Sequence, residues 1–120
     1  EPYNLDFRNK LAQAQVEGNK IEDARKNFEF IISENPKYAS AYVSLGFLFL
    51  SVDHNIERAD NFYDVALALE PDNEQAMFNK AGSLYYLKRT REAEKMLERL
   101  LKKNPQRTDA RQMLEIIKKG

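Results

Sequence analysis

The four prolines of this chain recur at an almost constant interval. They are Pro2, Pro36, Pro71 and Pro105, and successive prolines are 34, 35 and 34 residues apart. Proline cannot continue an α-helix, and it biases the residue before it away from helical geometry. Each proline is therefore expected to end one helix and to open the next unit. Self-similarity at this interval predicts an array of stacked repeats.

The residues before each proline share one apolar pattern. In all three units an alanine is followed four and seven residues later by apolar residues, and twelve residues later by the proline. Steps of three and four residues are the period of an amphipathic helix. The alternation of small and large residues, as in Gly46 after Leu45 and Ala66 after Tyr63, allows two antiparallel helices to approach closely. The middle unit is one residue longer, and its extra residue is expected in the turn around residues 52–55.

This pattern resembles the tetratricopeptide repeat family, and the resemblance covers nearly the whole chain. The middle unit matches the family pattern at each of its positions, which are Tyr42, Leu45, Gly46, Phe49, Ala59, Tyr63, Ala66 and Pro71. The outer units depart from it. Arg8 and Gln15 replace aromatic residues in the first unit, and Lys80 replaces the leucine in the third. The resemblance implies an all-α, right-handed α-solenoid of antiparallel helix pairs, a superhelix in which the first helices line a concave groove.

The pattern predicts seven helices in a single domain that spans residues 1–120. The expected helices cover residues 5–17, 21–33, 39–51, 56–69, 74–87, 90–103 and 108–118. We divide them into repeats at about 5–36, 39–71 and 74–105, followed by a capping helix at about 108–119. The last helix has no partner after it, and its polar residues are expected to face water, as the terminal helix of an array requires.

Charge and composition exclude several classes of protein. The formal net charge is zero, which argues against general nucleic-acid binding. Residues 88–120 carry a charge of +6 and the remainder −6; a solvated basic face is expected there, with an acidic partner as the alternative. No apolar run is long enough for a membrane span. The absence of cysteine excludes disulfides and thiolate chemistry but leaves the cellular compartment open.

The sequence offers no constellation of residues for catalysis. The single histidine, His54, falls in a turn without nearby partners in the sequence, and is expected to be an exposed turn residue. The serines lack a nucleophile-elbow context, and there is no glycine-rich phosphate loop. We therefore expect no enzyme activity, no cofactor and no metal site.

The repeat register places a set of amide, apolar and aromatic side chains on the expected groove. Candidate partner-binding residues are Asn9, Gln13, Val43, Ser44, Phe47, Gln75, Phe78, Asn79, Tyr85 and Tyr86. Amides pair well with an extended backbone, and exposed aromatic residues mark partner sites. The alternative is that neighbouring helices cover some of these side chains. This alternative is strongest for Leu50, Phe78 and Tyr85.

One ligand class of the family is not expected. Family members that bind the C-terminal carboxylate of chaperones use a clamp of cations and asparagines. The corresponding positions here are Asn9, Gln13, Ser44, Gln75 and Asn79, and none carries a positive charge.

The chain is therefore interpreted as a non-catalytic protein-interaction module that binds a peptide segment of an unidentified partner in its groove. The alternative is a structural assembly element that self-associates. Because Pro2 lies where a preceding repeat would end, the chain is also interpreted as a possible excised part of a longer protein.

Overall fold

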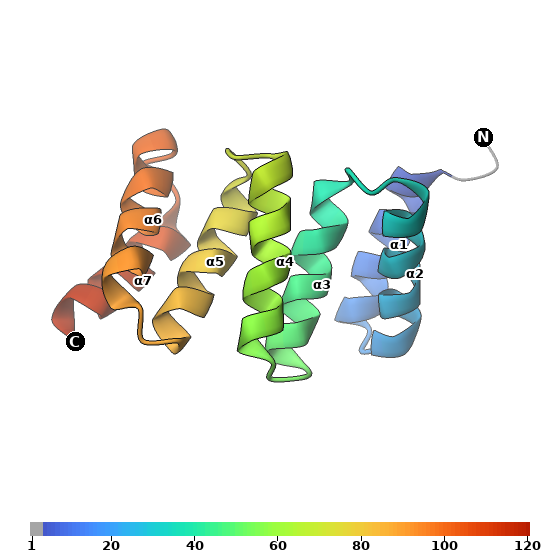
Figure 1. The fold of residues 1–120 in the computed structure, drawn as a ribbon, viewed down its shortest axis with the longest axis horizontal. Helices are drawn as coiled ribbons and strands as arrows, with labels where there is room; N and C mark the ends of the chain where they lie inside the picture. The colour runs from blue at the N-terminus through green and yellow to red at the C-terminus, as the bar shows by residue number, and fades with distance from the viewer. Residues whose placement is uncertain (1–3) are drawn as a thin grey trace.

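The computed structural model of the protein describes residues 4–120, and within them the regular structure is entirely α-helical. The helices are α1 (Leu5–Glu17), α2 (Ile21–Glu34), α3 (Ala39–Ser51), α4 (Ile56–Leu69), α5 (Glu74–Tyr86), α6 (Thr90–Lys103) and α7 (Thr108–Lys119). They follow one another along the longest axis, giving a body of 49 × 27 × 22 Å (Figure 1). The expected all-α solenoid of seven helices is confirmed for these residues, whereas Pro2 lies outside them.

Helix ends follow the local sequence signals. Asn4, Asn55 and Asn73 each cap a helix, because their side-chain oxygens accept the backbone N–H three residues later at 2.9–3.1 Å. The expected end of α5 at Leu87 is one residue too late. Leu87 is already the capping residue, and its N–H reaches the carbonyl of Ser83.

The three turns inside the helix pairs share one backbone conformation. Asn19, His54 and Lys88 have φ values of 62°, 55° and 63°, respectively, in the left-handed region. Asparagine tolerates this region, whereas lysine has no such preference. The turn within each pair thus depends on one left-handed residue, and the third pair uses a poorly suited one.

The core consists of three buried clusters that follow one another along the array. Each unit contributes a small residue from its first helix and a large residue from its second: Ala12 with Phe28, Gly46 with Tyr63, and Ala81 with Leu97. The contact is tightest in the middle unit. A Cβ placed on Gly46 would lie 2.5 Å from Cε1 of Tyr63. The alternation of small and large residues therefore sets how closely α3 and α4 pack.

The departures of the outer units from the repeat pattern are compensated by polar contacts. In the first unit, Arg8 donates to Asn27 at 2.9 Å, and Asn27 donates to Gln15 at 2.7 Å. The equivalent positions of the middle unit hold the aromatic cluster of Tyr42, Phe49 and Phe62. At these three positions the first repeat therefore has hydrogen-bonded polar side chains where the second repeat has packed aromatic rings.

Lys80 joins two repeats instead of filling the core. Its ammonium group lies 2.8 Å from Asp60 and 2.7 Å from Asp64, both on α4. Burial opposes the charged form of Lys80, but the hydrogen bonds and negative charges of the two carboxylates outweigh it and raise the pKa of the lysine. The residue that breaks the family pattern is therefore held by an ion pair between α4 and α5.

The last helix covers the end of the array. Ala110 and Ile117 of α7 are buried against α5 and α6, with Leu114 packed beside them. Ile116 does not belong to this cluster and is 58% exposed. No helix within residues 4–120 combines the length and the apolar character that crossing a membrane requires.

Candidate functional site

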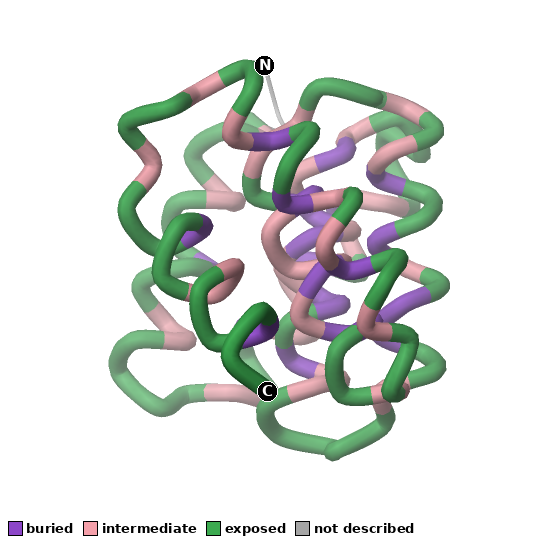
Figure 2. The backbone as a smooth tube through the Cα atoms, turned by 90° about the vertical axis from the view of Figure 1, so that its left-hand side faces the viewer, coloured by how far each residue is buried: buried purple, intermediate pink, exposed green. Residues whose placement is uncertain are grey.

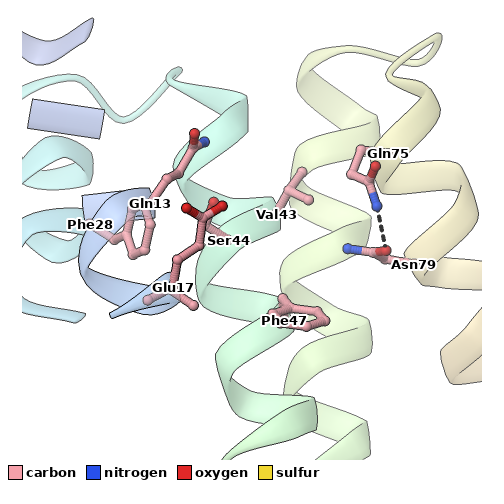
Figure 3. A pocket seen from close by; sticks show the side chains of 9 residues that line it. Gln13, Glu17, Phe28, Val43, Ser44, Phe47, Gln75 and Asn79 are labelled. Carbon is pink, nitrogen blue, oxygen red and sulfur yellow. Dashed lines mark hydrogen bonds between the residues drawn. The ribbon is translucent and has the colours of Figure 1, made fainter. Parts of the chain in front are cut away.

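A cavity of about 440 Å³ opens on the surface formed by the first helices of the three repeats. It is lined by residues of α1, α2, α3 and α5: Gln13, Val16, Glu17, Phe28, Val43, Ser44, Phe47, Gln75 and Asn79 (Figure 3). Val43 is 7% exposed, so it forms the floor. Phe47 is 46% exposed and stands at the wall. The cavity is therefore an amide-rimmed hollow with an apolar floor.

A second cavity of about 390 Å³ lies on the other side of Phe47. Its lining is mostly apolar and aromatic: Phe47, Leu50, Ser51, His54, Ile56 and Tyr86. Phe47 is the one residue that lines both cavities. We call the two cavities together the groove.

The amides of the groove are held in defined positions. Gln75 donates to Asn79 at 2.9 Å, as Figure 3 shows, and accepts a hydrogen bond from Arg107 at 2.8 Å. Asn9, which lines neither cavity, donates to Ser40 at 3.4 Å, and its side-chain oxygen is buried with no hydrogen-bond partner among the described residues. The Gln75 and Asn79 side chains are thereby oriented toward the first cavity before any ligand arrives.

Seven of the ten candidate residues line the groove. Gln13, Val43, Ser44, Phe47, Gln75 and Asn79 line the first cavity, and Tyr86 the second. Asn9, Phe78 and Tyr85 line neither. Phe78 is half-buried, with the guanidinium of Arg107 5.3 Å from its ring centre, and Tyr85 is exposed beside Tyr86.

Three groove residues and one cation were not anticipated. Phe28 falls in a helix expected at residues 21–33, Ile56 begins another, and His54 is an exposed turn residue as expected. None of the three was a candidate, and all three line a cavity. Arg107 was not among the candidate residues. Its guanidinium reaches Asp109 at 2.9 Å and Glu74 at 3.5 Å, which raises its pKa, chiefly through the hydrogen bond to Asp109. Contacts between separate repeats of this kind leave no signal in the repeat pattern.

The electrostatic character of the groove follows from these contacts. Glu17 is the one charged residue that lines the first cavity. The nearest cation to its amides, Arg107, is engaged with two carboxylates. The groove thus presents hydrogen-bonding amides, aromatic surface and one negative charge.

Comparison with solved structures shows the same fold at low sequence identity. The first repeat domain of Spaghetti (RPAP3), bound to the HSP90 peptide SRMEEVD, is 16% identical with a TM-score of 0.89, over 96% of this chain and 93% of that chain. The Arabidopsis OM64 domain is 19% identical with a TM-score of 0.85, over 96% and 94%. The Yersinia enterocolitica type III secretion chaperone SycD, in complex with a peptide of the translocator YopD, is 21% identical with a TM-score of 0.80, over 95% and 92%.

Comparison with sequence families gives a consistent result. No curated protein matches the chain. Two family models described as tetratricopeptide repeat match residues 9–51 and 53–117, and the second alone covers more than half of the chain. With the repeat spacing, the seven helices and these matches together, the chain belongs to the tetratricopeptide repeat family.

Proposed function

We propose that the protein is an interaction module that holds an extended segment of a partner protein in the groove. The observation that carries the proposal is the pair of cavities that share Phe47. An extended segment places alternate side chains on opposite sides, and neighbouring anchors about 7 Å apart. Such a segment seats one apolar side chain on each side of the Phe47 ring. Family membership supports a binding role, since such repeats generally serve as non-catalytic interaction modules.

The amides supply the polar half of the recognition. Gln13, Ser44 and Asn79 offer donors and acceptors along the first cavity, and an extended backbone carries both. Gln75 already orients Asn79, so less side-chain entropy is lost on binding. These contacts fix the position and direction of the segment, while the two apolar anchors supply most of the affinity.

The charge of the groove selects against an acidic C-terminal tail. Carboxylate recognition needs cations or several converging donors, and the residues that line the first cavity include Glu17 and no cation. The Spaghetti structure holds an HSP90 peptide with an acidic end, and SycD holds a YopD peptide. We propose that this chain takes an internal segment with two apolar anchors, and not an acidic carboxyl terminus.

Selection from a library of displayed random peptides tests the proposal. Enriched peptides are expected to carry two apolar residues and to lose affinity for the Phe47→Ala/Tyr86→Ala variant by roughly 100-fold, since two hot spots contribute about 3 kcal/mol. Tyr85→Ala is the matched control. It removes a similar aromatic side chain from the same helix as Tyr86, but Tyr85 lines neither cavity. The affinity of the Tyr85→Ala variant for the selected peptides should therefore stay near that of the wild type.

Equal binding by the double variant and the wild type would refute the assignment to the groove. Enrichment of peptides with acidic carboxyl termini would refute the proposed ligand class. Circular dichroism of each variant separates these outcomes from loss of folding.

A further inference from the structure

A chain of hydrogen bonds runs from the start of α7 to the wall of the first cavity. The guanidinium of Arg107 donates to the side-chain oxygen of Gln75 at 2.8 Å. The side-chain nitrogen of Gln75 in turn donates to the side-chain oxygen of Asn79 at 2.9 Å (Figure 3). Arg107 lies in the connection between α6 and α7, the two helices at the end of the array that faces the viewer in Figure 2. It lines neither cavity of the groove, whereas Gln75 and Asn79 line the first. We call these three residues the amide relay.

The direction of the amide relay follows from the chemistry of its first member. A guanidinium has N–H donors and no acceptor, so only the oxygen of the Gln75 amide can face Arg107. The nitrogen of Gln75 is therefore turned toward Asn79, and only the oxygen of the Asn79 amide can accept from it. A reversed Gln75 would set its NH2 group against the donors of Arg107, and a reversed Asn79 would set two NH2 groups against each other. The relay thus leaves the NH2 group of Asn79 for other partners.

The first member of the relay is itself held from several sides. The guanidinium of Arg107 lies 2.9 Å from Asp109 and 3.5 Å from Glu74, and it is 5.3 Å from the ring centre of Phe78. The side chain of Arg107 is 17% exposed. Because two carboxylates and a ring fix the guanidinium, the donor that faces Gln75 is in place before a ligand binds. The orientation of both amides therefore originates outside the groove.

The surroundings of Asn79 agree with this orientation. Burial raises the pKa of Tyr63, the negative charge of Asp60 raises it further, and Asn79 beside it lowers it. A neighbour lowers the pKa of a phenol in this way when its donor faces the phenol oxygen, so the nitrogen of Asn79 lies on this side. The contact falls short of a hydrogen bond of good geometry, because the hydroxyl group of Tyr63 has no partner within residues 4–120. Asn79 is half-buried in the cavity wall, and its NH2 group is available to a ligand.

We infer from the fixed direction of the amide relay that Arg107 is a positioning residue of the groove: through Gln75 it makes Asn79 a hydrogen-bond donor to a main-chain carbonyl of the bound segment. The inference rests on the proposed peptide binding, and it adds the chemistry that the partner presents to α5. Each residue of an extended segment carries one such carbonyl. A carbonyl is satisfied by one donor, whereas a carboxylate requires cations or several converging donors. The partner therefore turns an internal carbonyl, and not an N–H, toward Asn79.

Binding of a selected peptide that depends on Phe47 and Tyr86 tests this role of Arg107. Asn79→Leu should lower the affinity roughly 10–100-fold, because it leaves the carbonyl of the peptide buried and unpaired. Arg107→Met should lower the affinity about tenfold, because the two amides are then free to turn and lose more freedom on binding. Arg107→Lys should recover most of that loss, since an ammonium group also carries donors and no acceptor.

Two comparisons separate positioning from a purely structural role of Arg107. Asn104→Ala is the matched control, because Asn104 joins the same connection to α5 by a 3.0 Å hydrogen bond to Glu74 but has no contact with the two amides. The peptide affinity of Asn104→Ala should stay near that of the wild type. In the Asn79→Leu background there is no amide to orient, so adding Arg107→Met should cause no further loss of affinity. An equal loss in both backgrounds, or no loss from Arg107→Met alone, would overturn the inference.

The amide relay is also tested in the free protein, by NMR relaxation of the side-chain NH2 groups. The NH2 group of Asn79 should be rigid in the wild type and in Asn104→Ala, and mobile in Arg107→Met. Gln112 provides the mobile reference, since it is exposed and makes no hydrogen bond through its side chain within residues 4–120. An Asn79 NH2 group as mobile in the wild type as that of Gln112 would overturn the inference.

These experiments distinguish failure of the inference from failure of the proposed function. Peptides that lose affinity for Phe47→Ala/Tyr86→Ala, but bind Asn79→Leu and Arg107→Met as tightly as the wild type, would overturn the inference and leave the proposed function intact. Peptides that bind Phe47→Ala/Tyr86→Ala as tightly as the wild type would refute the proposed function, and the inferred contact with a bound carbonyl would fall with it. Circular dichroism of each variant shows whether it is folded.

Discussion

The close approach of α3 and α4 at Gly46 can be tested by adding a single methyl group. In Gly46→Ala the new Cβ would lie 2.5 Å from Cε1 and 2.9 Å from Cδ1 of Tyr63. Tyr63 is fully buried, so its ring cannot move away without displacing the core between α4 and α5. Overpacking of this kind costs about 3 kcal/mol at the upper end of its usual range.

A gain in helix propensity offsets part of this cost. Alanine is favoured over glycine inside a helix by about 1 kcal/mol. The net loss in the free energy of unfolding is therefore expected to be about 2 kcal/mol. The first repeat indicates that this loss in the free energy of unfolding is an upper limit. It packs Ala12 against the ring of Phe28 with both residues fully buried, so a wider spacing of the helices is attainable.

The third repeat suggests the decisive comparison. There Ala81 packs with Leu97, a pair that Gly46→Ala/Tyr63→Leu would reproduce in the second repeat. In the Tyr63→Leu background the added methyl group meets no ring. Gly46→Ala should then be neutral or stabilising by up to about 1 kcal/mol. Urea unfolding followed by circular dichroism gives the four free energies, and the cycle should show a coupling of 2–3 kcal/mol, by order of magnitude. An equal cost of Gly46→Ala in both backgrounds would refute the steric explanation.

Two further changes test other contacts by the same urea unfolding. Lys80→Leu restores the usual apolar residue but leaves the buried carboxylate of Asp60 without its cation, so it should cost about 3 kcal/mol. Adding Asp60→Ala should recover most of that loss; no recovery would locate the cost in lost packing of the lysine stem. Lys88→Gly should stabilise the fold by about 0.5–1 kcal/mol, because Lys88 has φ 63° and glycine adopts this region freely. Glu94→Gly, in a helix with ordinary backbone geometry, should instead destabilise it.

The sequence predicted the fold well because every repeat carries the same local signals. Proline spacing, asparagine caps and three-to-four periodicity act within one or two helices, and each was readable without tertiary information. The alternation of small and large residues predicted a close approach of the paired helices, but it did not predict that Gly46 meets Tyr63. The replacement residues were recognised as departures, but their compensation was not. Lys80 and Asp60 are twenty positions apart, and nothing local indicates that they meet.

The groove was harder to predict, since it is built between repeats. The register identified the residues of the first helices that line it, such as Gln13 and Phe47. It gave no indication that Phe28 of a second helix, or His54 of a turn, would contribute to the lining. These contributions depend on the angle at which successive helix pairs stack, which the pattern of one repeat does not specify.

The repeat register gives every first helix a groove face and a stacking face. In α3 the stacking face is buried by the preceding repeat, so the groove face alone remains available. In α1 both faces are exposed within residues 4–120: Phe7 and Leu11 lie on the stacking face, and Gln13 and Glu17 line the first cavity on the groove face. Which face of a first helix can bind a partner is therefore decided by the unit packed against that helix, and not by the repeat pattern, which is the same in each case.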